Sequence, residues 1–117
     1  MSEEVVIYHN PRCSKSRQTL ELIKSNDINP TIVEYLKNPL AKDEVEVLLK
    51  KLDCKISDVI RKNEAEYKEI ISKNPDLSDD EKINAIVEVP KLLERPIVVV
   101  GNKAVIGRPP ENVLEII

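Results

Sequence analysis

Apolar and polar positions follow two periods along the chain, and the changes of period divide it into elements. Residues 5–8 are a short β-branched and aromatic run, which predicts a buried strand ending at an Asn-Pro turn. Residues 14–26 contain no Gly or Pro and repeat apolar residues three positions apart, which predicts a helix. Residues 31–36, after a second Asn-Pro pair, again favour a strand. This order and spacing predict a parallel βαβ unit.

The middle of the chain has mostly helical patterns. Apolar residues over 45–52 are spaced as on one face of a helix, with charged residues on the other faces. We expect a short helix over residues 57–60 and another helical piece over 64–72. Residues 78–81 resemble a capping box at the start of a further helix. Residues 41–89 are therefore predicted to form a helical block.

The end of the chain returns to a strand pattern. Residues 97–100 and 103–106 predict two antiparallel strands joined by a tight Gly-Asn turn, followed by a last helix that begins at a Pro-Pro pair. The whole pattern predicts an α/β fold with a four-stranded mixed sheet and a mostly helical insertion between the second and third strands. A length of 117 residues predicts a single domain over 1–117.

Cys13 is the candidate reactive group, because it lies where the first predicted strand gives way to the first helix. Its segment, residues 9–17, reads His-Asn-Pro-Arg-Cys-Ser-Lys-Ser-Arg. Unpaired N–H groups and the helix dipole favour an anion there, and Arg12, Lys15 and Arg17 add positive charge. These factors predict a thiol pKa below the usual value of about 8.5. The alternative is a small buried apolar side chain, the common role of a free cysteine.

Other residues of the segment have candidate roles beside Cys13. Ser16 makes the motif Cys-x-x-Ser, which excludes a local disulfide, and its hydroxyl is suited to donate a hydrogen bond to the sulfur. The backbone amides of Ser14, Lys15 and Ser16 are suited to hold an oxyanion. His9 either tunes the charge of the site or acts only as a hydrogen-bonding loop residue.

Composition excludes several other classes of function. The net charge of −3 argues against nucleic-acid binding, and one His with two Cys provides no metal-ligand set. No apolar run approaches the roughly 18–20 residues of a membrane span, and the acidic start is unlike a signal peptide. These properties predict a cytoplasmic protein that binds neither nucleic acid nor membrane. Separately from composition, we expect a monomer that requires no bound cofactor.

The segment 9–17 resembles the active-site signature of the glutaredoxin-coupled arsenate reductases, a thioredoxin-fold family that is also related to the Spx-type regulators. The resemblance extends over residues 8–111 and is strongest to a short bacterial subgroup that also carries Gly-Arg-Pro-Pro. One departure is Ser14, which stands where the best-known members have glycine. The resemblance implies a thioredoxin-like fold.

The resemblance also implies roles for residues far from the cysteine. Arg61, Arg95 and Arg108 match the three arginines that bind the oxyanion substrate in the family. Ser14 and Lys15 are expected to contribute to the same binding. Arginine suits this role because its planar fork is always charged and pairs bidentately with oxyanions. Pro96 matches the cis-proline that faces the active cysteine. The simpler alternatives are surface arginines and a trans peptide bond.

The implied function is an arsenate reductase in which the Cys13 thiolate forms a covalent bond to arsenic, with glutathione as co-substrate and glutaredoxin as partner. One alternative is a monothiol glutaredoxin-like thiol oxidoreductase, which needs no arginines. The other is an Spx-like regulator that binds RNA polymerase, but that class expects a second cysteine where Ser16 stands. Cys54 is interpreted as an ordinary structural cysteine, and the alternative is a resolving thiol for Cys13.

Overall fold

A computed structural model describes residues 4–117 of the chain. These residues form two compact units, one from the residues up to Asn38 together with Arg95–Ile117, and one from Pro39–Glu94. Within the described range, every helix is too short or too polar to cross a membrane.

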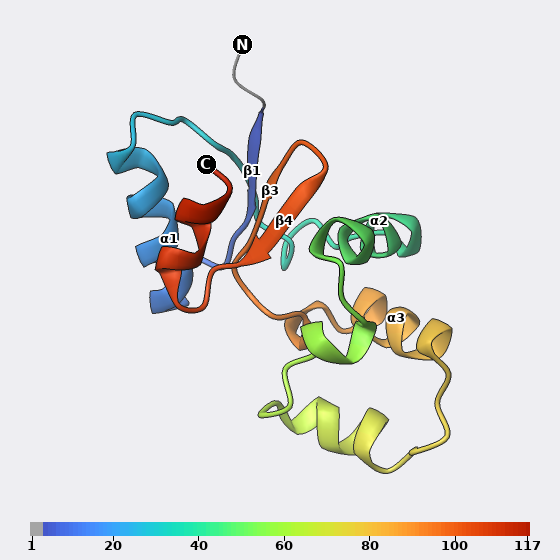
Figure 1. Cartoon of the computed structure of the whole chain (residues 1–117). Coiled ribbons are helices and arrows are strands. Elements are labelled where there is room, and N and C mark those ends of the chain that lie inside the picture. Colours follow the sequence, from blue (N-terminus) through green and yellow to red (C-terminus); the bar gives the residue numbers. More distant parts are fainter. Residues whose placement is uncertain (1–3) are drawn as a thin grey trace. The chain divides into compact units, whose positions relative to one another are not determined.

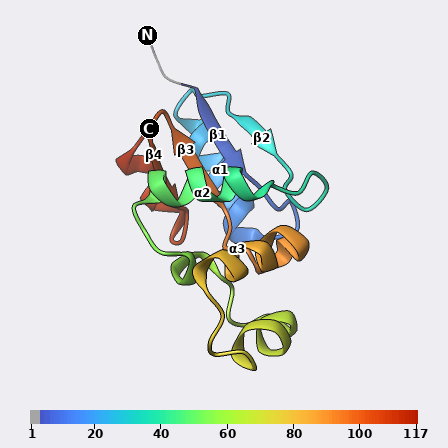
Figure 2. The same cartoon turned by 90° about the vertical axis from the view of Figure 1, so that its right-hand side faces the viewer.

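The first unit contains the predicted four-stranded mixed sheet. Its strands are β1 (Val5–Tyr8), β2 (Thr31–Val33), β3 (Ile97–Val100) and β4 (Lys103–Ile106), in the order β2-β1-β3-β4 (Figure 2). Strand β1 pairs in parallel with β2 and antiparallel with β3, and β4 pairs antiparallel with β3. The fold class and both strand directions predicted from the sequence are confirmed.

Strand β2 is shorter than the sequence pattern predicts. The prediction extends it to residue 36, but the strand ends at Val33. The N–H groups of Lys37 and Asn38 both donate to the Glu34 carbonyl, at 2.9 and 3.0 Å. This turn uses backbone groups that a longer strand would need for pairing, so the apolar run continues without strand structure.

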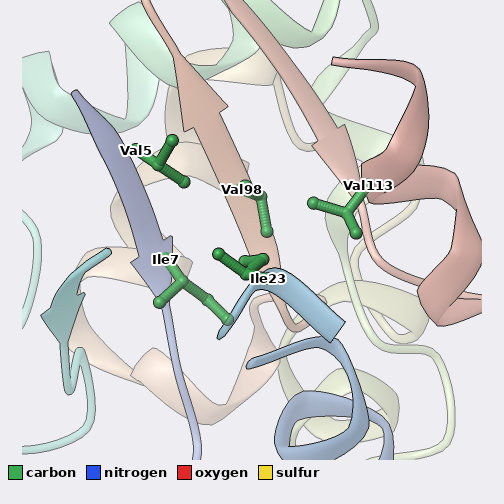
Figure 3. Packing of buried hydrophobic residues seen from close by; sticks show 5 residues of the cluster. All are labelled: Val5, Ile7, Ile23, Val98 and Val113. Atoms are coloured by element: carbon green, nitrogen blue, oxygen red, sulfur yellow. The ribbon is translucent and has the colours of Figure 1, made fainter. Parts of the chain in front are cut away.

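Helix α1 (Ser14–Ser25) and the 3₁₀ helix η4 (Pro110–Glu115) lie side by side next to the sheet (Figure 1). The last helix begins where predicted, but it is wound as 3₁₀. Side chains from both helices meet side chains of β1 and β3 in the core (Figure 3). The central cluster consists of Val5, Ile7, Ile23, Val98 and Val113, all buried.

The second unit is the predicted helical block. It contains α2 (Lys42–Leu52), η1 (Ile56–Val59), η2 (Tyr67–Ser72), α3 (Asp79–Glu88) and η3 (Pro90–Leu92). Helix α3 contacts α2, η1 and η3, and the buried face of the unit is aliphatic. The insertion between the second and third strands is therefore helical, as predicted, although η1 and η3 are 3₁₀ helices and η2 is a π-helix.

The predicted capping box begins α3. The Glu81 N–H donates to the Ser78 hydroxyl at 3.2 Å, and the Ser78 N–H donates to the Glu81 carboxylate at 3.2 Å. Each residue thus satisfies a backbone donor that the first turn of a helix leaves free.

Replacement of Ile23 tests whether α1 is held by its packing on the sheet. Ile23 is fully buried, so Ile23→Ala should lower the free energy of unfolding by about 3 kcal/mol, because transfer and cavity costs add. Urea unfolding followed by circular dichroism measures the change. Leu114→Ala is the control: its side chain is 49% exposed, and the expected change is within about 0.5 kcal/mol. Equal losses in the two variants would contradict this packing.

Candidate active site

Cys13 is the N-cap residue of α1, in extended backbone conformation (φ −92°, ψ 124°), and its side chain is half-buried. The Arg17 N–H donates to the Cys13 carbonyl at 3.0 Å, and the Cys13 N–H donates to the Asn10 carbonyl at 3.0 Å. The sulfur therefore lies at the positive end of the helix dipole, where the first amides have no partner within the helix.

The pKa of the Cys13 thiol lies below its ordinary value, as the sequence predicts. Burial raises this pKa, but several groups that stabilise the thiolate together outweigh burial. They are the Ser16 N–H, a hydrogen bond from the Arg95 side chain, the charge of Arg95, and the Lys15 N–H. The cationic residues next to Cys13 in the sequence were expected to supply the positive charge that lowers its pKa. In the structure this charge comes from Arg95.

The Ser16 hydroxyl joins the loop before the cysteine to α1. Ser16 is fully buried, and its oxygen lies 2.6 Å from Nδ1 of His9 and accepts the Asn10 N–H at 3.0 Å. Burial lowers the pKa of His9, so the ring is neutral at pH 7 and its Nδ1 can accept the Ser16 proton. The Ser16 N–H thus favours the Cys13 thiolate, while the Ser16 hydroxyl bonds to His9 and Asn10.

Further hydrogen bonds give the loop its shape. The Arg12 N–H donates to the side-chain oxygen of Asn10 at 3.0 Å, a turn that asparagine commonly makes. The Arg17 side chain donates to the Pro11 carbonyl at 2.9 Å. Ser14 and Lys15 are exposed in the first turn of α1. Arg17 is therefore used to hold the loop.

Sheet register brings distant segments to the same place. Tyr8 at the end of β1 pairs with Ile97 at the start of β3, and Ile97 pairs with Ile106 at the end of β4. The residues that follow β1, precede β3 and follow β4 therefore meet at one end of the sheet. Arg95 and Arg108 lie in the second and third of these segments.

Arg95 and Arg108 lie next to each other, and each precedes a proline through a cis peptide bond. The cis bond to Pro96 is predicted by the family resemblance, and the one to Pro109 is not. The Arg108 side chain donates to the Arg95 carbonyl at 3.5 Å. Within residues 4–117, the buried Nε–H of Arg95 has no hydrogen-bond partner. A buried donor of this kind is suited to receive an anionic ligand.

Arg61 belongs to the second unit, and its side chain faces two carboxylates. Its Nε lies 3.3 Å from Glu64 and its Nη1 lies 3.6 Å from Glu94. Its backbone N–H donates to the Leu92 carbonyl at 2.7 Å. The side chain is only 15% exposed, so it is not the solvated surface arginine of the simpler alternative.

Two residues that connect α1 to the segment after β4 were not given a role from the sequence. Thr19, fully buried in α1, donates from its hydroxyl toward the Gly107 carbonyl, and the Gly107 N–H donates to the Pro96 carbonyl at 2.8 Å. The available signals were a threonine on the buried face of the predicted helix and a glycine immediately before Arg108.

The second cysteine has a different environment. Both cysteines are free, and Cys54 is half-buried just after α2. Burial raises its pKa, and the charges of Asp58 and Asp53 raise it further. These groups disfavour a thiolate, which fits the interpretation of Cys54 as a structural residue. In the described part of the chain, no group of three His, Cys, Asp or Glu side chains is arranged to hold a metal ion.

Comparison with known proteins gives a consistent result. The sequence model of the ArsC family matches residues 8–116. The chain is similar to the Escherichia coli K12 protein YfgD, at 49% identity with 100% of this chain and 99% of that protein covered. It is 46% identical to an arsenate reductase of Haemophilus influenzae, covering 97% and 98% of the two chains. The structure of an arsenate reductase from Vibrio cholerae matches with a TM-score of 0.96 and 44% identity, covering 100% of both chains.

The opposite environments of the two cysteines predict different reactivity. In Cys54→Ser, which leaves Cys13, the rate of reaction with iodoacetamide should rise through a midpoint below about 8.5 as pH increases, because only the thiolate reacts. In Cys13→Ser, which leaves Cys54, the midpoint should lie above that value. Adding Arg95→Gln to the first variant should raise its midpoint. Coincident midpoints for the two thiols would contradict the assignment.

Proposed function

Because this chain belongs to the ArsC family, we propose that it is an arsenate reductase that uses the Cys13 thiolate as nucleophile and depends on glutathione and glutaredoxin. The observation that carries the proposal is the convergence on the Cys13 sulfur of Arg95 and the amides of Lys15 and Ser16. These groups favour a thiolate, and the same kinds of group bind oxyanions.

In the proposed complex, arsenate lies against the sulfur and is held by arginine side chains. The unpartnered Nε–H of Arg95 and the adjacent guanidinium of Arg108 supply donors and charge for its oxygens. Ser14 and Lys15 at the start of α1 add helix N-terminal donors. Pro96 fixes the backbone beside Arg95, and the neutral His9 with Ser16 holds the loop.

The first proposed step forms a bond between the Cys13 sulfur and arsenic. The thiolate attacks the arsenic of arsenate, and one arsenic–oxygen bond breaks, with the leaving oxygen departing as water after protonation. Arsenic stays pentavalent in this covalent intermediate. The positive charge of Arg95 and Arg108 stabilises the negative charge on the remaining oxygens during the attack.

The second proposed step reduces arsenic. A glutathione thiolate attacks the Cys13 sulfur, and the electron pair of the sulfur–arsenic bond stays on arsenic, which leaves as trivalent arsenite. A glutaredoxin thiolate then attacks the glutathione sulfur of the mixed disulfide and releases Cys13. This cycle needs no second cysteine in the chain, and we place it in the cytoplasm, where thiols are kept reduced.

Substitution of each cysteine tests the proposed nucleophile. Cys13→Ser should abolish arsenite production in the presence of glutathione and glutaredoxin, because a serine hydroxyl is not ionised near neutral pH. Cys54→Ser is the matched control and should keep at least about half of the activity, since its thiol has no proposed part. Arsenite formed from arsenate is measured directly, and mass spectrometry follows the Cys13 adduct. A wild-type protein that exchanges disulfides with glutathione but forms no arsenite would contradict the proposal.

Arg61 is proposed as the third oxyanion ligand. Its ion pairs offer an alternative role, so the two roles can be tested against each other. Arg61→Gln should raise the KM for arsenate about tenfold if a charge-assisted contact of roughly 1.4 kcal/mol is lost. If Arg61 only balances the charges of Glu64 and Glu94, the variant should be less stable but have an unchanged KM. Steady-state kinetics together with a thermal melt separates the two outcomes.

A further inference from the structure

Thr19 is a fully buried polar residue in the second turn of α1, and its hydroxyl connects two parts of the site. The hydroxyl lies 2.8 Å from the Lys15 carbonyl and 3.3 Å from the Gly107 carbonyl. The N–H of the same Lys15 contributes to the lowered pKa of the Cys13 thiol. Thr19 therefore contacts both the turn that holds the sulfur and the segment that follows β4.

Gly107 makes this contact possible because it has no side chain. A Cβ atom at this position would lie 2.7 Å from the Thr19 Oγ1, 3.0 Å from the Thr19 Cγ2 and 2.9 Å from the Pro96 Cγ. The first and third separations are shorter than real Cβ contacts. Only glycine lets the backbone after β4 lie this close to both α1 and Pro96.

The contact between Gly107 and Thr19 determines the position of the residue that follows Gly107. Arg108 follows Gly107 directly, and its guanidinium reaches the carbonyl of Arg95, the residue whose charged side chain lowers the pKa of the Cys13 thiol. A displacement of the Gly107 backbone away from Thr19 would carry Arg108 with it. The sulfur would keep its own donors, Arg95 and the amides of α1.

We propose that Thr19 and Gly107 are positioning residues that hold the Arg108 guanidinium beside Arg95, at the end of the sheet where Cys13 lies, so that its charge attracts an anionic reactant. The claim that this reactant is an arsenic oxyanion rests on the proposed function. The claim about geometry does not, since any small anion that reacts with Cys13 experiences the same charge.

Alkylation of Cys13 by two reagents tests the geometry without arsenate. Iodoacetate is anionic and iodoacetamide is neutral, so the ratio of their rate constants reports the positive charge near the sulfur. In a Cys54→Ser background, Gly107→Ala should lower this ratio about fivefold, the effect of one nearby charge in water. Arg108→Gln should lower the ratio to the same extent. The pH midpoint of the iodoacetamide reaction should rise less than in Arg95→Gln, because Arg95 and the amides remain.

Four further variants separate positioning from general destabilisation. Gly101→Ala alters the other glycine of the chain, at the β3–β4 turn with φ 61°, and should lower stability without changing the ratio. Thr19→Val keeps the side-chain shape but loses the hydroxyl, so it should lower the ratio, whereas Thr19→Ser should preserve it. Thr19→Ala added to Gly107→Ala removes two of the three close contacts and should restore part of the ratio.

The outcomes distinguish this inference from the proposed function. An unchanged ratio in Gly107→Ala, or in Thr19→Val if the alanine variant does not fold, would overturn the inference. A wild-type ratio in Arg108→Gln would also overturn it. If the ratios fall as expected while the wild-type protein produces no arsenite, the positioning role stands and the proposed function fails. If arsenite is produced, the same variants should raise the KM for arsenate more than they lower kcat.

Discussion

The site depends on the position of Cys13 at the start of α1, where the amides of the first turn stabilise a thiolate. A helix necessarily begins with amides that have no partner inside it, and here the amides of Lys15 and Ser16 favour the thiolate form of the N-cap residue Cys13. These amides stabilise the thiolate without the help of a carboxylate or a metal ion. The reactivity of the sulfur therefore follows from where the helix begins. The shape of the loop after β1 allows the helix to begin at that residue.

The sheet supplies what the helix lacks. Local sequence provides donors to the sulfur but not the guanidinium that contacts it, which comes from Arg95 just before β3. The pairing of Tyr8 with Ile97, and of Ile97 with Ile106, places three segments at one end of the sheet. A change of strand register would reverse the faces of the side chains and also separate Arg95 and Arg108 from the cysteine.

The buried face of α1 has a polar part that contributes to the site and an apolar part that contributes to stability. Near its start, the buried residues are Ser16 and Thr19, whose hydroxyls bond to the loop before the helix and to the segment after β4. Near its end, Ile23 enters the aliphatic cluster on the sheet. Buried hydroxyls are costly unless they are hydrogen bonded, so the polar half is specific in geometry and the apolar half supplies most of the packing.

The sequence correctly predicted most of the elements, the mixed sheet and the position of Cys13, because hydrophobic period, turn residues and helix-start chemistry are local properties. It did not reveal the early end of β2, which a backbone turn at Glu34 decides. Three features appear only in the folded protein: Arg95 rather than Arg17 lowers the pKa of Cys13, Arg61 faces Glu64 and Glu94, and Gly107 lies against Thr19. These contacts join residues that strand pairing and packing bring together, and no local pattern encodes such distances.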